Sequence, residues 1–420
     1  MKSVVQAVYE IETTEDIGQL AAEIAGEQSS GTFVALARET AELRSRHSAE
    51  VVKIEEIELS GHSPLPGATG DWAQAKRARV AIDFPLENFG ASIPNLMAAV
   101  AGNLFEITKA GAIRLVDLDL PCDFARRYPG PQFGWEGTLE RMTTESGPLL
   151  GTIVKPSIGL GPDALGELVT ELARAGIDFI KDDELQGNPE YFPFAERVRV
   201  VTGALDRVAD ETGHRPMYAF NITDDVERMV ANHDLVRTHG GTCVMVTVNA
   251  VGYSSLSYLR ERCDLPIHGH RAMIGAYARS PQVGIDFCVF QKLARLSGAD
   301  HIHTNGLRNK FYGSDEEILA AINAVRTPLL GGYGAVPVLS SGQTPDLAHE
   351  TYARVGADEL LVLAGGGIHG HPGGSAAGVR AMRAAWDAAL EGVDLKVRAA
   401  EVPELAAALT KFRPTATMAS

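Results

Sequence analysis

From residue 149 onward the chain alternates between short apolar runs typical of buried strands and longer amphipathic runs typical of helices. Eight strand-like runs occur, at residues 150–155, 177–181, 217–222, 243–248, 266–270, 301–305, 336–340 and 359–364. Strands that alternate with helices form parallel sheets, and eight such repeats in about 250 residues predict a closed (β/α)8 barrel. An open, doubly wound sheet is the competing architecture. We expect the barrel at residues 149–400 and a C-terminal tail at 401–420.

The first part of the chain has a mixed pattern. Strand-like runs at 4–10, 51–54 and 79–82 are interspersed with helical runs at 17–26 and 93–104. This pattern predicts an α+β domain at residues 1–125. Residues 126–148, irregular and rich in proline, glycine and arginine, are expected to connect the two domains.

The charge balance excludes several kinds of partner. A net charge of −16 argues against binding to nucleic acid or to an anionic membrane. No run approaches the roughly 20 apolar residues of a membrane span, and the N-terminus lacks the apolar run of a signal peptide. We therefore expect a cytoplasmic protein. The four cysteines form no CxxC pair and are expected to be buried free thiols.

Polar residues gather where the predicted barrel strands end, which is where barrel enzymes build their active sites. The ends carry Lys155, Lys181 to Glu184, Asn221, Asn249, His268 to Arg271, His301 to Asn305, Ser340 to Gly342, and Gly365 to Gly367. A scaffold alone would not need so many polar groups at equivalent positions.

The second strand runs directly into Lys181, Asp182, Asp183 and Glu184. Such a charge run can be a solvated face. At a barrel strand end, however, Asp183 and Glu184 are suitable Mg²⁺ ligands, because hard divalent cations prefer carboxylate oxygens. A lysine that shifts to its neutral amine can react with carbon dioxide and become an anionic ligand, which gives Lys181 a role beside the metal.

Two histidine pairs follow the fifth and sixth strands. His268 and His270 share one face of a strand, as do His301 and His303, so a zinc site is one interpretation and buried core histidines are another.

The remaining strand ends indicate anion binding. In a barrel, backbone N–H groups after strands seven and eight often bind phosphate, and Gly365 to Gly367, Ser340 and Gly342 lie there. Arg271 could hold a second anionic group. Lys310, on a glycine-flanked loop, fits a closing lid. The structural alternatives are that Gly365 to Gly367 only form a tight turn and that the loop of Lys310 only connects two elements.

Four motifs in this order resemble the RuBisCO large-subunit superfamily over nearly the whole chain. They are Gly-Thr-Ile-Val-Lys-Pro at 151–156, Gly-Ile-Asp-Phe-Ile-Lys-Asp-Asp-Glu at 176–184, His-Gly-His-Arg-Ala-Met at 268–273, and Ala-Gly-Gly-Gly at 364–367. The resemblance implies a ferredoxin-like N-terminal α+β domain before the barrel. It also implies homodimers whose active sites lie between one subunit's barrel and the other's N-terminal domain.

The resemblance also implies roles for single residues. Lys181 would carry a CO2-derived carbamate and bind Mg²⁺ together with Asp183 and Glu184. Catalytic roles would fall to Lys155, Lys181, His270 and Lys310, and substrate or phosphate binding to Arg271, His303, Ser340, Gly342, Gly366, Gly367, Thr32, Glu27 and Asn103. Of these, Thr32, Glu27 and Asn103 would act on the neighbouring subunit's site.

Departures from the family pattern narrow the activity. Carboxylating members have a second lysine where this chain has Ser157, so the resemblance is to RuBisCO-like proteins rather than to enzymes that fix carbon. The methionine-salvage enolase has a lysine base at the position of Asn103 and lacks the arginine found here as Arg271. Residues 155–159, 183–189 and 304–310 look more like members that act on 3-oxo-isoapionate 4-phosphate, as decarboxylase or as transcarboxylase/hydrolase.

We therefore expect a Mg²⁺-dependent enzyme that forms a metal-stabilised enediolate on a phosphorylated oxo sugar acid. Two alternatives remain at this point: an enolase or isomerase of methylthio-sugar phosphates, and a non-catalytic RuBisCO-like binding protein.

Overall fold

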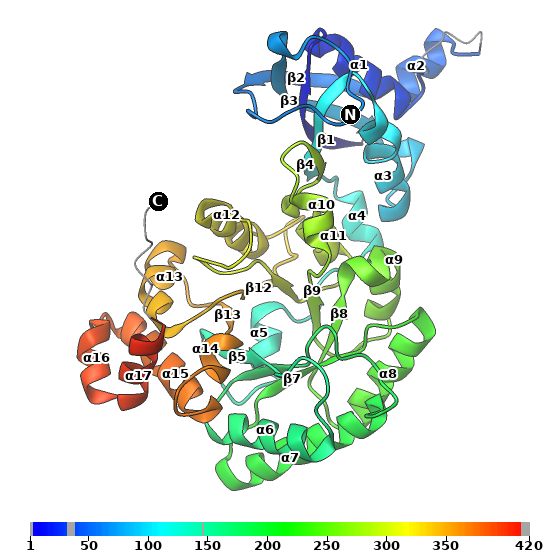
Figure 1. Cartoon of the computed structure of the whole chain (residues 1–420). Coiled ribbons are helices and arrows are strands. Elements are labelled where there is room, and N and C mark those ends of the chain that lie inside the picture. Colours follow the sequence, from blue (N-terminus) through cyan, green and yellow to red (C-terminus); the bar gives the residue numbers. More distant parts are fainter. Residues whose placement is uncertain (1–2, 32–37, 145–146, 413–420) are drawn as a thin grey trace. The chain divides into compact units, whose positions relative to one another are not determined.

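The computed structural model describes residues 3–31, 38–144 and 147–412 (Figure 1). The chain forms two compact units. The first, which we call the N-terminal unit, contains Met1–Gly130, Ala272–Ser297 and Leu329–Gly332. The second, the barrel unit, contains Pro131–Arg271, Gly298–Pro328 and Tyr333–Ser420.

The N-terminal unit is built on a five-stranded mixed sheet in the order β10-β4-β1-β3-β2. Its strands are β1 (Val4–Thr13), β2 (Glu50–Ile57), β3 (Lys76–Pro85), β4 (Ala110–Asp119) and β10 (Val283–Ile285). Strand β1 pairs antiparallel with β3 and β4, whereas β10 is parallel to β4. Alternate residues of β1 are buried, as a strand with one covered face requires. The predicted α+β domain is confirmed, although β4 and β10 were not predicted.

Helices complete the N-terminal unit. They are α1 (Ile17–Glu27), α2 (Ala41–His47), α3 (Ile93–Val100), α4 (Asp123–Arg127), α10 (Ile274–Ala278) and α11 (Phe287–Leu296), with 3-10 turns at Trp72–Gln74, Leu86–Asn88 and Asn103–Glu106. Helix α1 begins at a capping residue, since the Asp16 side chain accepts a hydrogen bond from the backbone N–H of Gln19. Its buried residues Ile17, Leu20, Ala21 and Ile24 form one face at helical spacing.

The barrel unit contains eight parallel strands that close on themselves, which confirms the barrel and excludes the open sheet. The strands are β5 (Leu149–Ile153), β6 (Phe179–Lys181), β7 (Met217–Asn221), β8 (Cys243–Thr247), β9 (Ile267–His270), β11 (His301–His303), β12 (Val336–Leu339) and β13 (Leu361–Leu363). Each lies within one or two residues of a predicted run.

Helices surround the barrel strands (Figure 1). They are α5 (Gly134–Leu139), α6 (Pro162–Arg174), α7 (Phe194–Thr212), α8 (Val226–Thr238), α9 (Val248–Arg260), α12 (Asp315–Arg326), α13 (Ala348–Val355), α14 (Gly366–His369), α15 (Ser375–Glu391), α16 (Leu395–Glu401) and α17 (Pro403–Lys411). A 3-10 turn at Pro345–Leu347 precedes α13. Part of the expected tail is therefore α17, whose Leu405 and Ala408 are buried. The expected connecting segment contains α5.

Side chains fill the barrel interior. Phe179, Met217, Met245 and Val338 belong to one buried cluster, and Trp135 of α5 packs against it. The interior is thus a packed core rather than a channel, and space for a ligand is left to the loops at the strand ends.

The buried carboxylate of Asp300 ties the start of α5 to the barrel. Asp300 and Arg260 are both fully buried, with Nη1 and Oδ2 3.0 Å apart. Asp300 also accepts hydrogen bonds from the backbone N–H groups of Ile267 at 2.8 Å and of Phe133, just before α5, at 2.8 Å. Burial raises the pKa of Asp300, while Arg260 and these N–H groups favour its ionised form.

Two smaller predictions can also be compared with the structure. Cys243 and Cys263 are buried free thiols as expected, but Cys122 is exposed and Cys288 only partly buried, so that prediction was wrong for Cys122. Among the described residues, the helices are all too short or too polar to cross a membrane.

Candidate active site

Lys181, the last residue of β6, is buried inside the mouth of the barrel. Its Nζ donates to the backbone carbonyl of Asp182 at 2.7 Å and lies 3.4 Å from Oε2 of Glu184. Burial lowers the pKa of Lys181, because an ammonium loses its hydration there, and the nearby carboxylates oppose this effect only in part. The lowered pKa favours the neutral amine of Lys181, the form that reacts with carbon dioxide.

Asp183 is joined to the lysine that follows β5. Nζ of Lys155 lies 2.6 Å from Oδ2 of Asp183 and 2.8 Å from Oγ of Ser157. Burial raises the pKa of Asp183, but hydrogen bonds from Lys155 and from the backbone N–H of Leu185 outweigh it, so the net pKa is lowered. Asp183 is almost fully buried, whereas 40% of the Lys155 side chain is exposed, which leaves this ammonium accessible to a ligand.

Glu184 lies between Lys181 and a histidine of β9. Nε2 of His270 is 3.5 Å from Oε2 of Glu184. Burial raises the pKa of Glu184, and the fields of His270 and Lys181 bring it below its ordinary value. Burial, aided by Lys181, lowers the pKa of His270 to about 3, so this imidazole is neutral at pH 7.

Asp182, between these groups in sequence, has a different role. Its carboxylate accepts hydrogen bonds from the Tyr218 hydroxyl at 2.6 Å and from the backbone N–H of Asn221 at 2.8 Å, and it lies 3.2 Å from Nε of Arg197. All of these side chains are buried. Asp182 therefore anchors the loop, while Asp183 and Glu184 remain directed at the lysines.

Asn221, the end of β7, supports the same loop. Its side-chain amide donates to the backbone carbonyls of Glu184 and Gln186, each at 3.2 Å. These bonds fix the backbone that carries the two carboxylates.

Arg271, His303 and Ser340 lie at neighbouring strand ends. Nη1 of Arg271 donates to the backbone carbonyl of Thr304 at 3.4 Å, and burial lowers the pKa of Arg271 to about 10, so it stays a cation at pH 7. Nδ1 of His303 lies 3.3 Å from Oγ of Ser340. The rings of His303 and His270 are in edge contact, with centroids 4.5 Å apart. The three predicted binding residues and His270 therefore belong to one cluster.

The glycines form close turns beside Lys155. A Cβ on Gly367 would lie 2.1 Å from the backbone oxygen of Gln343, so the turns after β12 and β13 touch through their backbones. A Cβ on Gly365 would lie 4.0 Å from Cε of Lys155, whereas one on Gly366 would meet nothing within 4 Å. Gly342 has a φ of +98°, a conformation that favours glycine.

The loop that carries Lys310 lies over the turn after β12. The backbone N–H of Lys310 donates to the carbonyl of Ser341 at 3.3 Å, and the Ser341 hydroxyl donates to Oδ1 of Asn305 at 3.0 Å. The Lys310 side chain is exposed, with Nζ 5.4 Å from the centre of the Phe311 ring.

Two of the residues expected to reach a neighbouring subunit belong to the N-terminal unit. Glu27 ends α1 and Asn103 begins the turn after α3. Their neighbours in the sequence, Gln28 and Gly102, lie close to each other, since a Cβ built on Gly102 would lie 3.0 Å from Oε1 of Gln28. Thr32 lies outside the described residues.

The side chains at Lys181 have the chemistry for Mg²⁺. In the part of the chain that the structure describes, no group of three His, Cys, Asp or Glu side chains could hold a metal ion, so the zinc alternative gains no support. Two carboxylates and a buried amine remain. When both lysines are protonated, the charges of Lys155 and Lys181 cancel those of Asp183 and Glu184. A carbamate on Lys181 would replace a positive charge by a negative one and leave the site with a net charge of two negative units. One Mg²⁺ ion would neutralise that charge.

Arg197 and Tyr218, which hold the loop that carries the carboxylates, were not predicted from the sequence. Arg197 and Tyr218 hold Asp182, and one signal was available, since Arg197 stands on the apolar face of α7 between Phe194 and Val201. A buried arginine at such a position generally has an acidic partner.

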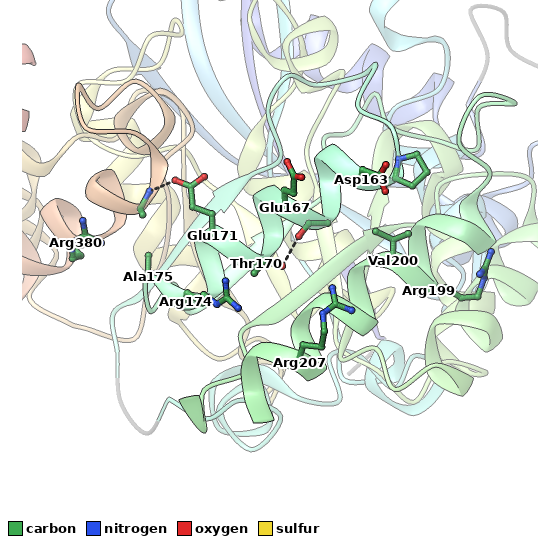
Figure 2. Close-up of a pocket in the computed structure, with 13 residues that line it drawn as sticks. Asp163, Glu167, Thr170, Glu171, Arg174, Ala175, Arg199, Val200, Arg207 and Arg380 are labelled. Carbon is green, nitrogen blue, oxygen red and sulfur yellow. Dashed lines mark hydrogen bonds between the residues drawn. The ribbon is translucent and has the colours of Figure 1, made fainter. Parts of the chain in front are cut away.

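A separate hollow of about 820 Å³ lies on the outside of the barrel, between α6, α7 and α15 (Figure 2). Its walls carry both signs of charge, including Asp163, Glu167, Arg174 and Arg207. Arg174 is already paired with Glu211 at 2.8 Å. This hollow is formed by helices rather than by strand ends, and it plays no part in the site described above.

A closed parallel barrel with a buried lysine, two carboxylates and glycine turns at its strand ends has the architecture on which barrel enzymes build their active sites. The sequence matches both domains of one family: the ribulose bisphosphate carboxylase large chain, catalytic domain, over residues 134–412, and the N-terminal domain of the same chain over residues 2–124. The chain belongs to the RuBisCO large-chain family.

Similar proteins place it among the RuBisCO-like members. It is 47% identical to the 3-oxo-isoapionate-4-phosphate transcarboxylase/hydrolase of Xanthobacter autotrophicus, with 98% of this chain and 100% of the relative covered. It is 43% identical to the 3-oxo-isoapionate-4-phosphate decarboxylase of Rhizobium etli, with 96% and 97% covered. A solved RuBisCO-like protein from Burkholderia fungorum has a TM-score of 0.89 at 39% identity, with 98% and 100% covered. The predicted resemblance is confirmed, including its subgroup.

Proposed function

We propose that this protein is a Mg²⁺-dependent enzyme that breaks a carbon–carbon bond of 3-oxo-isoapionate 4-phosphate, or of a closely similar phosphorylated oxo sugar acid. Two relatives that match nearly the whole chain are named for this substrate. The observation that carries the proposal is the contact of buried Lys181 with Glu184, beside the Asp183–Lys155 pair.

The metal part of the proposal follows from charge. A carbamate on Lys181 would hold Mg²⁺ together with Asp183 and Glu184. The ion would supply positive charge that stabilises negative charge developing on the substrate oxygens. Asn221 and Asp182 keep the loop in place, so little reorganisation is needed when the ion binds.

The other residues bind the substrate and move a proton. Arg271 is a half-buried cation that suits an anionic end of the substrate, and the turns at Gly342, Gly366 and Gly367 offer backbone N–H groups to a phosphate. Lys155 is the accessible ammonium. We assign to it the proton that the reacting carbon gains when the carboxyl group leaves.

Lys310 completes this account as the lysine of a closing loop. Its backbone is tied to Ser341 while its side chain is exposed, so the ammonium can turn toward a ligand without unfolding the loop.

Phosphorus and carbon NMR of the purified protein, with Mg²⁺, bicarbonate and 3-oxo-isoapionate 4-phosphate, tests the function. Release of carbon dioxide would identify a decarboxylase, and formation of phosphoglycerate plus glycolate would identify a transcarboxylase/hydrolase. Either result should disappear in Lys155→Met. Unchanged substrate, together with turnover of a methylthio-sugar phosphate, would overturn the proposal in favour of a methionine-salvage enolase.

A non-catalytic binding protein is the alternative from another class. It predicts binding of the sugar acid phosphate without chemical change. The same spectra would show this as broadened substrate signals and no product.

We further propose that the active form is a homodimer in which Glu27, Asn103 and Thr32 act on the partner's barrel. The proximity of α1 to the turn at Asn103 within the N-terminal unit supports a shared patch. Mixing Lys181→Ala with Asn103→Ala protein should restore part of the activity, since a mixed dimer regains one intact site. Activity that stays absent after mixing, with both variants folded and dimeric, would contradict the shared site.

A further inference from the structure

Three buried histidines of β9 and β11 form a continuous hydrogen-bonded file inside the barrel. Nε2 of His303 lies 2.7 Å from Nε2 of His268, and Nδ1 of His268 lies 3.3 Å from Nδ1 of His301. None of the three exposes more than 3% of its surface. His268 is bonded to His303 through Nε2 and to His301 through Nδ1, so both of its ring nitrogens have a partner.

The file has a hydroxyl at each end. At the active site, Nδ1 of His303 lies 3.3 Å from Oγ of Ser340. At the other end, Nε2 of His301 lies 2.9 Å from Oγ1 of Thr138, a buried residue of α5. The file therefore connects the substrate-binding cluster to α5, a helix that contributes no residue to the proposed substrate or metal site.

Thr138 determines the direction of every bond in the file. Its hydroxyl donates its single proton to the backbone carbonyl of Gly134, which can only accept. Toward His301, Thr138 Oγ1 must therefore act as an acceptor. Nε2 of His301 carries the proton, and Nδ1 of His301 is left to accept.

The same reasoning passes along the file, because a neutral imidazole has one donor and one acceptor nitrogen. His268 must donate from Nδ1 to His301, so its Nε2 accepts. His303 must then donate from Nε2 to His268, so its Nδ1 accepts. Among the residues that the structure describes, Ser340 is the one within hydrogen-bond distance of Nδ1 of His303, so its hydroxyl donates that bond.

We propose that Thr138 is a positioning residue for the active site: through His301 and His268 it fixes His303 as the Nε2–H tautomer and turns the Ser340 proton toward Nδ1 of His303. Ser340 then faces a ligand with lone pairs only. It accepts from a hydroxyl group of the ligand and does not donate to a phosphate oxygen.

This selectivity at Ser340 rests on the proposed function, whereas the tautomers do not. It differs from our sequence-based expectation that Ser340 adds a donor to a phosphate site. The phosphate is left to the glycine turns and Arg271, and Ser340 recognises the hydroxyl-bearing part of the sugar acid.

The surroundings of the file keep it neutral. Burial lowers the pKa of His301 to about 3 and the pKa values of His268 and His303 well below the ordinary range. His270 is in ring contact with His303 and carries no charge at pH 7, and Phe179 packs on both His268 and His301. A second proton on His268 or His301 would point a donor at a neighbouring donor, so charge on either of these two rings would break the file rather than reverse it.

Long-range proton–nitrogen NMR of ¹⁵N-histidine-labelled protein, without substrate, tests the tautomers directly. We expect single tautomers in the wild type, with protons on Nε2 of His303, Nδ1 of His268 and Nε2 of His301, assigned by single His→Gln variants. Thr138→Ser should keep this pattern. Thr138→Val should lose it, and His303 should then populate both tautomers.

Thr202→Val provides the matched control. Thr202 is also buried on a helix, and its hydroxyl donates to the carbonyl four residues earlier, that of Val198, at 2.8 Å. It should leave all three histidines unchanged. A wild-type His303 with its proton on Nδ1 would overturn the proposal, and so would an unchanged pattern in Thr138→Val. The wild-type spectrum decides even where Thr138→Val does not fold, and no outcome depends on the identity of the substrate.

Discussion

Nζ of Lys155 lies 2.6 Å from Oδ2 of Asp183, so a single ion pair joins the end of β5 to the end of β6. The pair links the two chemical roles that we assign to the site. Asp183 belongs to the proposed metal group, and Lys155 is the accessible cation beside it.

Lys155→Met should lower turnover by about 10²- to 10⁴-fold, the usual contribution of a positioned acid or base. The reason is the loss of the proton donor, so Mg²⁺ binding should survive. Steady-state rates and calorimetric Mg²⁺ titration measure the two effects separately. Lys396→Met, at an exposed position of α16, is the control and should behave as wild type. Full turnover in Lys155→Met would remove Lys155 from the mechanism.

Arg271→Gln should weaken binding of inorganic phosphate by roughly tenfold or more, since a hydrogen bond to a charged group is worth about 1.5–3 kcal/mol. The loss should appear as a higher KM, with kcat less affected. Calorimetry with phosphate provides the measurement, and Arg262→Gln, an exposed arginine paired with Glu261, provides the control. Equal phosphate affinity in Arg271→Gln and wild type would show that another group holds the anion.

Gly367→Ala and Gly366→Ala should differ sharply. A Cβ at 367 would lie 2.1 Å from the Gln343 carbonyl, whereas at 366 it would meet nothing within 4 Å. Overpacking costs about 1–3 kcal/mol, so Gly367→Ala should unfold at lower denaturant concentration and Gly366→Ala should stay close to wild type. Equal stability of the two variants in urea titrations would contradict the close backbone contact.

Acid should destabilise the protein through His301. The pKa of His301 is about 3 in the folded state, below the ordinary value of 6.5, because burial disfavours the charged ring. The unfolded state therefore binds a proton below about pH 6.5 that the folded state does not, and stability falls as the pH drops from 6.5 toward 3. Each such histidine contributes about 1.4 kcal/mol per pH unit in this window.

Urea titrations at several pH values test this contribution. His301→Gln should show a shallower loss of stability between pH 6.5 and 4.5 than wild type. His62→Gln, at an exposed position, should keep the wild-type slope. If all three proteins showed the same slope, unfolding would not be coupled to proton uptake by His301, and the prediction would be contradicted.

Much of the fold could be predicted because its strands are short, apolar and separated by helices. The strands missed were β4 and β10. Strand β4 lies between two neighbours and is buried at most positions, so it lacks the alternation that marks a half-exposed strand. Strand β10 has only three residues, and its partner β4 is about 170 positions away, a pairing that no local pattern encodes.

The candidate site divides in a similar way. Lys181, Asp183, Glu184 and His270 were found because strand ends of a barrel meet at one face. The residues that hold these side chains in place were not predicted. The hydrogen bonds from Tyr218 to Asp182 and between Thr138 and His301 depend on which side chains meet in three dimensions, which a local sequence pattern does not encode. Motif resemblance supplied roles that the pattern alone did not indicate, such as the action of Glu27 and Asn103 on a neighbouring subunit's site.

Carbon NMR of the protein in ¹³C-bicarbonate, with and without Mg²⁺, tests the central claim most directly. We predict one carbamate signal per chain that grows with Mg²⁺, is kept in Lys155→Met and is absent from Lys181→Ala and Lys181→Gln, both checked for folding by circular dichroism. A wild-type spectrum without a carbamate, or a carbamate that persists in the Lys181 variants, would contradict the account.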